Sequence, residues 1–363
     1  MILLNPGPVG LSERVRAALT LPDLCHREPE FAALQDEIRA RLLEVYGLER
    51  GDWAPVLISG SGTAAVEAML ASLVPRDGRV LVVENGVYGS RMAEIARCHG
   101  IGAASLKLAW GEELDRAVLA RALDEAPGVT HVAVVQHETT TGRLNDLDAV
   151  AAACQERGVR MLVDAVSGFG AEALDFGGWP LAACAGSANK CLHGAPGLSF
   201  VVARRDALAR GVARGVYLDL ARHARAQDAR ETAFTPAIPA FYALWEALRE
   251  LAEEGGWSAR HARYAALSEA VERGLTALGV EPLLREGARS VALRAYRLPL
   301  ALSYAALHDH LKQHGFVIYA GQGALAAEIF RVSTMGAVGA HDLERFVSVL
   351  GALPGWRRRR ARA

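Results

Sequence analysis

The sequence predicts an α/β fold, a mainly parallel sheet flanked by helices, followed by a smaller C-terminal α+β domain. Between residues 55 and 202, short runs of apolar residues alternate with longer runs of helical pattern. Strands that are apolar throughout and separated by helices are typical of a mainly parallel sheet covered on both faces. With 363 residues, 51% of them hydrophobic, the chain can fill the cores of one large and one smaller domain.

The composition narrows the class of protein. Lys+Arg number 40 and Asp+Glu 41, so the formal net charge of -1 favours a small-molecule substrate over a nucleic acid or a membrane surface. The five cysteines are scattered and odd in number, which argues against a disulfide framework and against a zinc site. No basic region precedes the short apolar run at the N-terminus, and no later segment is apolar for long enough to span a bilayer. We therefore expect a cytoplasmic location.

Residues 1–20 are predicted to form an N-terminal arm. The prolines and the glycine of Asn5-Pro6-Gly7-Pro8 prevent a helix there, and residues 12–19 then follow a helical pattern. Another helix is expected at 31–46. The polar pair His26-Arg27 before it either faces a ligand or caps and solvates the start of this helix.

Residues 21–255 are predicted to form the large domain. Its expected strands lie at 56–58, 80–83, near 104, 131–135, 159–163, 180–185 and 198–202, and its expected helices at 64–73, 89–99, 114–125, 147–157 and 240–253. The charged segment 204–230 is expected to be irregular. Because right-handed crossovers place the strand-to-helix loops at one edge of such a sheet, the polar residues of those loops can converge.

Residues 256–355 are predicted to form the smaller domain, after Gly255-Gly256 has ended the last helix of the large one. Its expected helices lie at 258–278, 303–314 and 340–350, and its expected strands at 291–295, 316–319 and 329–332. Residues 356–363 are basic, and we expect a solvated, disordered tail there. The alternative for this tail is a contact with an anion or a nucleic acid.

The turn Gly60-Ser61-Gly62-Thr63 lies between an expected strand and an expected helix. Glycines let the backbone approach an anion, the helix N-terminus favours negative charge, and the hydroxyls of Ser61 and Thr63 add donors. The turn lacks the Gly-Lys-Ser/Thr ending of a nucleotide phosphate loop and the third glycine of a dinucleotide motif. It therefore predicts a site for a small monophosphate cofactor.

Other polar side chains follow neighbouring strands. Tyr88 begins the next helix, where it either stacks on a flat ring or packs against protein, and Thr139 offers a hydroxyl at the same edge. Asp164 ends an apolar strand, where a carboxylate needs a cationic or donor partner. Lys190 taken alone fits a solvated surface lysine, but beside these residues it is predicted to be a nucleophile.

Pyridoxal phosphate would satisfy all of these residues at once, with its phosphate on the Ser61 turn and its ring under Tyr88. The ring oxygen would then lie near Thr139, the pyridine nitrogen on Asp164, and the aldehyde on Lys190. Opposite charges about 4 Å apart, at an effective dielectric of about 20, attract by roughly 4 kcal/mol, which raises the pKa of the pyridine nitrogen by about three units. Asp164 would thus keep the ring protonated.

Five stretches of the chain, in this order, resemble the class V, fold type I aminotransferases that depend on pyridoxal phosphate. They are Gly60-Ser61-Gly62-Thr63, Asn85-Gly86-Val87-Tyr88-Gly89, Glu138-Thr139-Thr140-Thr141-Gly142, Asp164-Ala165-Val166-Ser167 and Ser187-Ala188-Asn189-Lys190-Cys191. The resemblance implies that Lys190 bonds to the cofactor and moves a proton, and that Asp164 holds the pyridine nitrogen. It also implies that Val166 packs under the ring and that Asn189 lies near the cofactor. The cofactor-binding residues that it implies are Ser61, Gly62, Thr63, Tyr88, Thr139, Asp164, Val166, Asn189, Lys190 and Thr235.

The same resemblance implies a homodimer with shared active sites, because Thr235 would reach the phosphate of the neighbouring subunit. It further implies that Arg331 binds the carboxylate of alanine and pyruvate in a bidentate pair. Judged from the residues alone, Arg331 lies inside an apolar strand, where an arginine needs a partner. That partner is either a substrate or an internal acid such as Glu328.

Within the family, the motifs are most similar to those of enzymes that transfer the amino group of 2-aminoethylphosphonate to pyruvate, giving phosphonoacetaldehyde and L-alanine. The alternative is an aminotransferase of the alanine/serine:glyoxylate type, which His26-Arg27-Glu28-Pro29 resembles more closely. A different class is a catalytically silent pyridoxal-binding protein. The chain departs from the family at Ala320-Gly321-Gln322, where a lysine often follows the glycine. The candidate residues for binding a phosphonate are Arg27, Arg222, His223 and Arg225.

Overall fold

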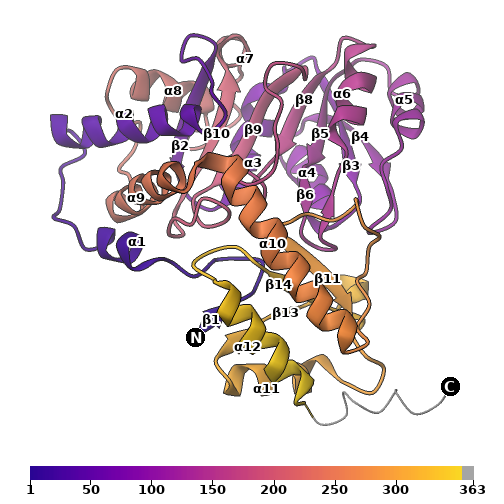
Figure 1. Ribbon diagram of the computed structural model, residues 1–363. Helices are drawn as coiled ribbons and strands as arrows, with labels where there is room; N and C mark the ends of the chain where they lie inside the picture. Colours follow the sequence, from indigo (N-terminus) through magenta and orange to yellow (C-terminus); the bar gives the residue numbers. More distant parts are fainter. Residues whose placement is uncertain (354–363) are drawn as a thin grey trace.

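A seven-stranded sheet lies at the centre of the larger part of the molecule (Figure 1). In spatial order its strands are β2 (Trp53–Ser59), β10 (Leu198–Arg204), β9 (Leu181–Ser187), β8 (Arg160–Asp164), β5 (Val129–Val135), β3 (Arg79–Glu84) and β4 (Gly102–Lys107). Strand β10 is antiparallel to both of its neighbours, and the other neighbouring pairs are parallel. This computed structural model describes residues 1–353, and it confirms the predicted mainly parallel sheet.

Helices cover both faces of this sheet. One face is packed by α2 (Pro29–Glu44), α5 (Arg116–Asp124), α6 (Leu147–Gln155) and α9 (Ile238–Glu254). The other face is packed by α3 (Gly62–Leu73), α4 (Val87–Cys98), α7 (Arg205–Ala209) and α8 (Leu220–Asp228). Successive side chains of a strand point to opposite faces, so Trp53 and Leu57 belong to the first core and Ala54 and Val56 to the second. Coverage of both faces explains why the strands are apolar at nearly every position.

The C-terminal part begins with the long helix α10 (Gly256–Ala277), which in Figure 1 runs from the large sheet toward the C-terminal strands. Gly255 separates it from α9 and adopts the left-handed conformation, with φ of 105°. A three-stranded antiparallel sheet follows, with a core of its own between the sheet and the helices. These elements are β11 (Leu293–Arg297), β14 (Ile329–Ser333), β13 (Tyr319–Ala320), α11 (Tyr304–Gln313) and α12 (Ala340–Gly351).

The N-terminal segment lies against the C-terminal part. Strand β1 (Ile2–Leu3) pairs in parallel with β12 (Phe316–Val317), and Leu4 is buried in the same core. Helix α1 (Glu13–Ala18) follows, capped by the hydroxyl of Ser12. The remaining elements are the hairpin of β6 (His137–Glu138) and β7 (Arg143–Leu144) and the 3-10 turn Gly323–Leu325. Among residues 1–353, no helix combines the length and the apolar character that crossing a bilayer requires.

Two predictions about elements are wrong. The segment 204–230 is not irregular, because it contains α7 and α8. The Asp219 side chain caps α8, and Leu220 and Ala224 pack one face of this helix into the core, while arginines on its outer face obscure the apolar stripe. The expected strand at 316–319 is divided between two sheets, since β12 pairs with β1 and β13 with β14. The tail predicted at 356–363 lies outside the described residues.

Candidate active site

The turn that precedes α3 has the conformation of an anion site. Ser61 is the N-cap residue of α3, with extended backbone, and its side chain makes no capping hydrogen bond. A Cβ atom on Gly62 would lie 2.7 Å from a methyl group of Val166, so only glycine lets this turn pack so closely. The N–H groups of a first helical turn have no intrahelical acceptors. The turn therefore presents N–H groups and a free hydroxyl to a ligand.

A single cavity joins this turn to several of the predicted residues. Its lining residues are Gly62, Thr63, Val66, Tyr88, Arg91, Asp164 and Val166. The structure thus brings together the predicted phosphate turn, the predicted stacking residue Tyr88 and the carboxylate of Asp164, with Val166 on the cavity wall. Arg91 is a residue that the sequence reasoning missed. Its position one helical turn after Tyr88 was the signal that could have found it.

Asp164 is the last residue of β8 and is buried. Its Oδ1 accepts a hydrogen bond from the Val166 N–H at 3.0 Å, and within the described residues no cation lies within ion-pair distance of the carboxylate. Burial raises the pKa of Asp164 to about 6, partly opposed by that hydrogen bond. A carboxylate held in this way is suited to a positively charged ligand atom.

Lys190 lies in the turn that follows β9 and is half-buried. Its Nζ donates a hydrogen bond to the Pro6 carbonyl, so the N-terminal segment lies across the lysine. Gly7 adopts φ of +124°, and a Cβ atom there would lie 2.5 Å from Nζ, which explains the glycine. Burial lowers the pKa of Lys190 to about 8. Lys190 is therefore not a solvated surface lysine, and a fraction of it is the neutral amine near neutral pH.

Three buried hydroxyl groups have no hydrogen-bond partner within residues 1–353, namely those of Thr139, Thr141 and Ser187. Of these, Thr139 is a predicted site residue, and Ser187 lies beside the predicted phosphate turn. Ser187 ends β9, and its Cβ lies 3.4 Å from the position of a Cβ on Gly62. An unpaired buried hydroxyl costs about 1–3 kcal/mol, so these last two groups fit a polar ligand that would complete their hydrogen bonds. Ser187 was not among the predicted site residues, although it stands in the same motif as Lys190.

Arg331 is 2% exposed on β14 and is fixed by two backbone carbonyls. Its Nε donates to the Ala320 carbonyl and its Nη1 to the Thr139 carbonyl, each at 2.9 Å. Within residues 1–353 no carboxylate is close enough to form an ion pair with it, so the alternative of pairing with Glu328 is wrong. Its Nη2 makes no hydrogen bond in the described part of the chain. Burial lowers the pKa of Arg331.

The structure does not bring every predicted residue into this cavity, whose lining includes none of Ser61, Thr139, Asn189, Lys190, Thr235 and Arg331. Asn189 is half-buried beside Lys190, and its side chain makes no hydrogen bond within the described residues. Thr235 lines a different cavity, of about 670 Å³, together with His26 and Arg27. Neither His26 nor Arg27 caps α2 with its side chain, because Glu28 is the N-cap residue.

The phosphonate candidates on α8 also lie outside the cavity at the predicted phosphate turn of their own chain. His223 is buried and is hydrogen-bonded through Nε2 to the Tyr217 carbonyl at 2.7 Å, so one of its ring nitrogens is already engaged. The Arg222 guanidinium lies 6.0 Å from the centre of the Phe234 ring. Arg225 lies on the exposed face of α8.

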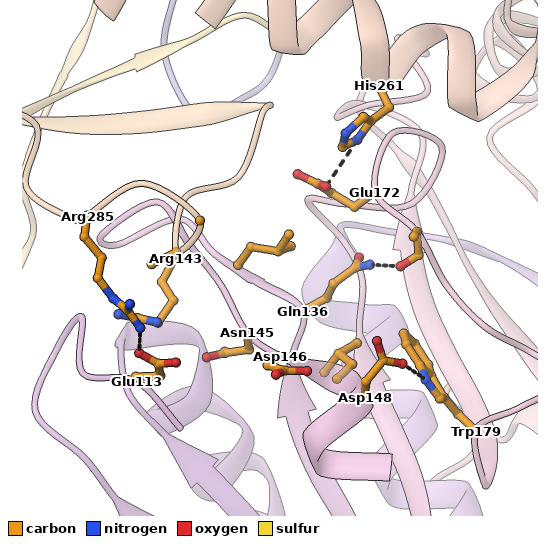
Figure 2. A pocket seen from close by; sticks show the side chains of 15 residues that line it. Glu113, Gln136, Arg143, Asn145, Asp146, Asp148, Glu172, Trp179, His261 and Arg285 are labelled. Atoms are coloured by element: carbon orange, nitrogen blue, oxygen red, sulfur yellow. Dashed lines mark hydrogen bonds and ion pairs between the residues drawn. The ribbon is translucent and has the colours of Figure 1, made fainter. Parts of the chain in front are cut away.

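A further cavity of about 370 Å³ lies between α6, α10 and the segment before β11, and contains none of the predicted residues (Figure 2). Its charged side chains are largely paired with one another. Figure 2 shows Glu172 beside His261, at 3.5 Å, and Asp148 accepting from the Trp179 indole N–H, at 2.7 Å. Because these groups satisfy one another, the cavity offers a ligand few free polar atoms.

Comparisons with known proteins agree with this geometry. The family model of class V aminotransferases matches residues 21–328. The chain is 40% identical to the 2-aminoethylphosphonate–pyruvate transaminase of Aeromonas hydrophila, over 93% of this chain and 90% of that protein. It is also 40% identical to the protein of that name from Burkholderia thailandensis, over 96% of this chain and 95% of that protein.

Solved structures show the same fold. An aspartate aminotransferase of subgroup IV from Thermus thermophilus is similar with a TM-score of 0.89 and 31% identity, covering 97% of this chain and 100% of that one. The alanine–glyoxylate aminotransferase of Nostoc sp. is similar with a TM-score of 0.91 and 28% identity, covering 97% of this chain and 94% of that one.

Proposed function

Because the chain belongs to the class V aminotransferase family, we propose that it transfers the amino group of 2-aminoethylphosphonate to pyruvate, giving phosphonoacetaldehyde and L-alanine. The observation that carries this proposal is the 40% identity to two transaminases named for these substrates, over 93% and 96% of the chain. The site supports the reaction type, since Lys190 and Asp164 lie at the predicted strand ends with perturbed pKa values.

The enzyme depends on pyridoxal phosphate, as its family does. When bound, this cofactor supplies an electron sink that takes up the amino group from one substrate and returns it to the other. The turn before α3 would hold the phosphate, and Tyr88 and Val166 would lie on the two sides of the ring. The unpaired hydroxyls of Thr139 and Ser187 would gain hydrogen-bond partners.

We assign the proton transfers to Lys190. Its pKa of about 8 lets Nζ accept a proton from the substrate and donate it again at moderate pH. Asp164 would hold a proton on the ring nitrogen, and that positive charge would in turn keep the carboxylate ionised. The N-terminal segment at Pro6 and Gly7 covers the amine and limits the access of water to it.

We propose that Arg331 binds the carboxylate of pyruvate and of L-alanine. Its Nε and Nη1 are held by backbone carbonyls, which leaves Nη2 for a ligand and fixes the direction in which it points. This arrangement places a buried cation beside Thr139, whose hydroxyl group has no partner within the described residues.

Single-turnover spectroscopy of the holoenzyme tests the substrate assignment. We expect 2-aminoethylphosphonate to change the absorbance of the bound cofactor within one turnover and pyruvate to restore it. If 2-aminoethylphosphonate leaves the absorbance unchanged while L-serine or L-alanine with glyoxylate turns over, the enzyme is of the glyoxylate type and the proposal is wrong. Borohydride reduction followed by peptide mapping should label Lys190, and a label elsewhere would contradict its role.

We further propose a homodimer in which Thr235 serves the neighbouring subunit. Its position outside the cavity at the predicted phosphate turn of its own chain supports this arrangement. Mixing inactive Lys190→Ala and Thr235→Ala proteins should restore activity in the heterodimer, and a mixture without activity would contradict shared sites.

We also propose a cytoplasmic location, which fits five free cysteines. The domain bounds 1–20, 21–255 and 256–355 likewise stand as proposals.

A further inference from the structure

Arg91 contacts both halves of the predicted cofactor site. It lies on α4 one turn after Tyr88, and its guanidinium carbon is 4.9 Å from the centre of the Tyr88 ring. Its Nη1 donates to the Thr63 hydroxyl at 3.3 Å. Thr63 belongs to the phosphate turn, and Tyr88 is the predicted stacking residue, so Arg91 bridges the two.

The Arg91 guanidinium forms no ion pair in the described part of the chain. Within residues 1–353 no carboxylate is close enough to form an ion pair with its guanidinium, and the side chain is half-buried. Asp164 lines the same cavity, but it lies beyond ion-pair distance and is the predicted partner of the ring nitrogen. An arginine that is partly removed from water and lacks an acid is arranged for an anionic ligand.

The predicted phosphate needs such a cation. A phosphate monoester carries a charge of about −1.5 to −2 at pH 7, whereas a helix N-terminus contributes only about +0.5. The hydroxyls of Ser61 and Thr63 donate hydrogen bonds but carry no charge. Among the seven residues that line the cavity, Arg91 is the one with a positive charge. Lys190 is committed to the aldehyde end of the cofactor.

We propose that Arg91 binds the cofactor's phosphate group. Its guanidinium would donate a hydrogen bond to the phosphate from its present position beside the Thr63 hydroxyl. The contact with the Tyr88 ring fixes the plane of the Arg91 guanidinium. Tyr88 would thus stack on the cofactor ring while Arg91 beside it binds the phosphate. The role of Arg91 rests on the proposed function, because it assumes pyridoxal phosphate as the cofactor.

Binding of two cofactor forms to the apoenzyme tests this role. Pyridoxal phosphate and pyridoxal differ only in the phosphate, so their dissociation constants, measured by absorbance titration, isolate the contacts that the phosphate makes. We expect Arg91→Gln to weaken pyridoxal phosphate by roughly 10- to 100-fold, the range for a charge-assisted hydrogen bond, and to change pyridoxal by less than about twofold. Arg91→Lys should recover part of the loss, because it keeps the charge.

Arg97→Gln is the matched control, since Arg97 lies on the exposed side of the same helix and, within residues 1–353, its side chain hydrogen-bonds only to the Cys98 sulfur. It removes the same charge from α4 and should leave both dissociation constants unchanged. The second measurement is the midpoint temperature of thermal unfolding. Inorganic phosphate should raise this temperature for the wild-type and Arg97→Gln apoenzymes, and the rise should be smaller for the Arg91→Gln apoenzyme.

Three results would overturn the assignment. Equal weakening of both cofactor forms in Arg91→Gln would mean that the arginine only supports Tyr88. Unchanged cofactor binding with a raised KM for the amine alone would mean that it faces the substrate anion. Unchanged binding together with an unchanged KM would leave it no role in the site. A wild-type apoenzyme that binds neither cofactor form would instead refute the proposed function itself, which separates the two failures.

Discussion

Replacing Asp164 with asparagine should slow the amino transfer while leaving the fold intact. The shape of the side chain is nearly unchanged, and Oδ1 can still accept the hydrogen bond from the Val166 N–H, which is 3.0 Å long. What is lost is the negative charge that we propose lies opposite the ring nitrogen. With about 4 Å between the charges and an effective dielectric of about 20, the lost attraction is roughly 4 kcal/mol, or about three pKa units at the ring nitrogen.

The expected loss of rate follows from that shift. A ring nitrogen whose pKa falls by about three units is mostly unprotonated at pH 8, so we expect the removal of the substrate proton to slow by roughly 100- to 1,000-fold. The assay is the single-turnover absorbance change with saturating 2-aminoethylphosphonate. The cofactor should still be bound by Lys190, and the circular dichroism spectrum should match that of the wild type.

Asp175→Asn is the matched control for this substitution. Asp175 also accepts from the N–H of the residue two positions later, Gly177, at 3.0 Å, but it is exposed and lies outside the candidate site. It should leave the rate unchanged. A rate for Asp164→Asn within about fivefold of the wild type, with the cofactor bound, would refute the idea that this carboxylate keeps the ring protonated.

Three other predictions follow from single side chains. Burial lowers the pKa of Lys190 to about 8, so the rate at which the apoenzyme captures pyridoxal phosphate should rise about tenfold from pH 7 to pH 9 and then level off. A rate that still rises steeply beyond pH 9 would indicate a lysine with an unshifted pKa. Arg331→Lys loses the planar guanidinium and its hydrogen bonds to two backbone carbonyls, so the KM for pyruvate should rise roughly 10- to 100-fold. An unchanged KM would mean that the pyruvate carboxylate binds elsewhere. Glu138 is buried and accepts hydrogen bonds from the Tyr88 and Gly89 N–H groups at the start of α4. Glu138→Gln should therefore lower the free energy of unfolding, measured in urea, by about 1–3 kcal/mol. Glu94→Gln, at an exposed position of α4, should leave it unchanged.

Much of the fold could be predicted because its strands and helices are marked by local periodicity. Strands buried on both faces are apolar throughout, and the helices between them keep one apolar stripe, so the alternation survives in the sequence. The pattern fails where a helix is short and its outer face is crowded with arginine, as in α8. It also fails at 316–319, where neighbouring residues pair with different sheets.

The sequence by itself determined the candidate site at the strand ends, because parallel strands must bring the loops that carry Thr63, Tyr88 and Asp164 to one edge. Tertiary structure alone decided which distant groups complete it. The Pro6 carbonyl meets Lys190 from 184 positions away, and the Thr139 carbonyl meets Arg331 from 192 positions away. Such contacts depend on how the N-terminal segment and the C-terminal sheet close over the large sheet, and no local pattern records that packing. The N-terminal segment also helps to bury Lys190, and this burial lowers the pKa of the lysine to about 8.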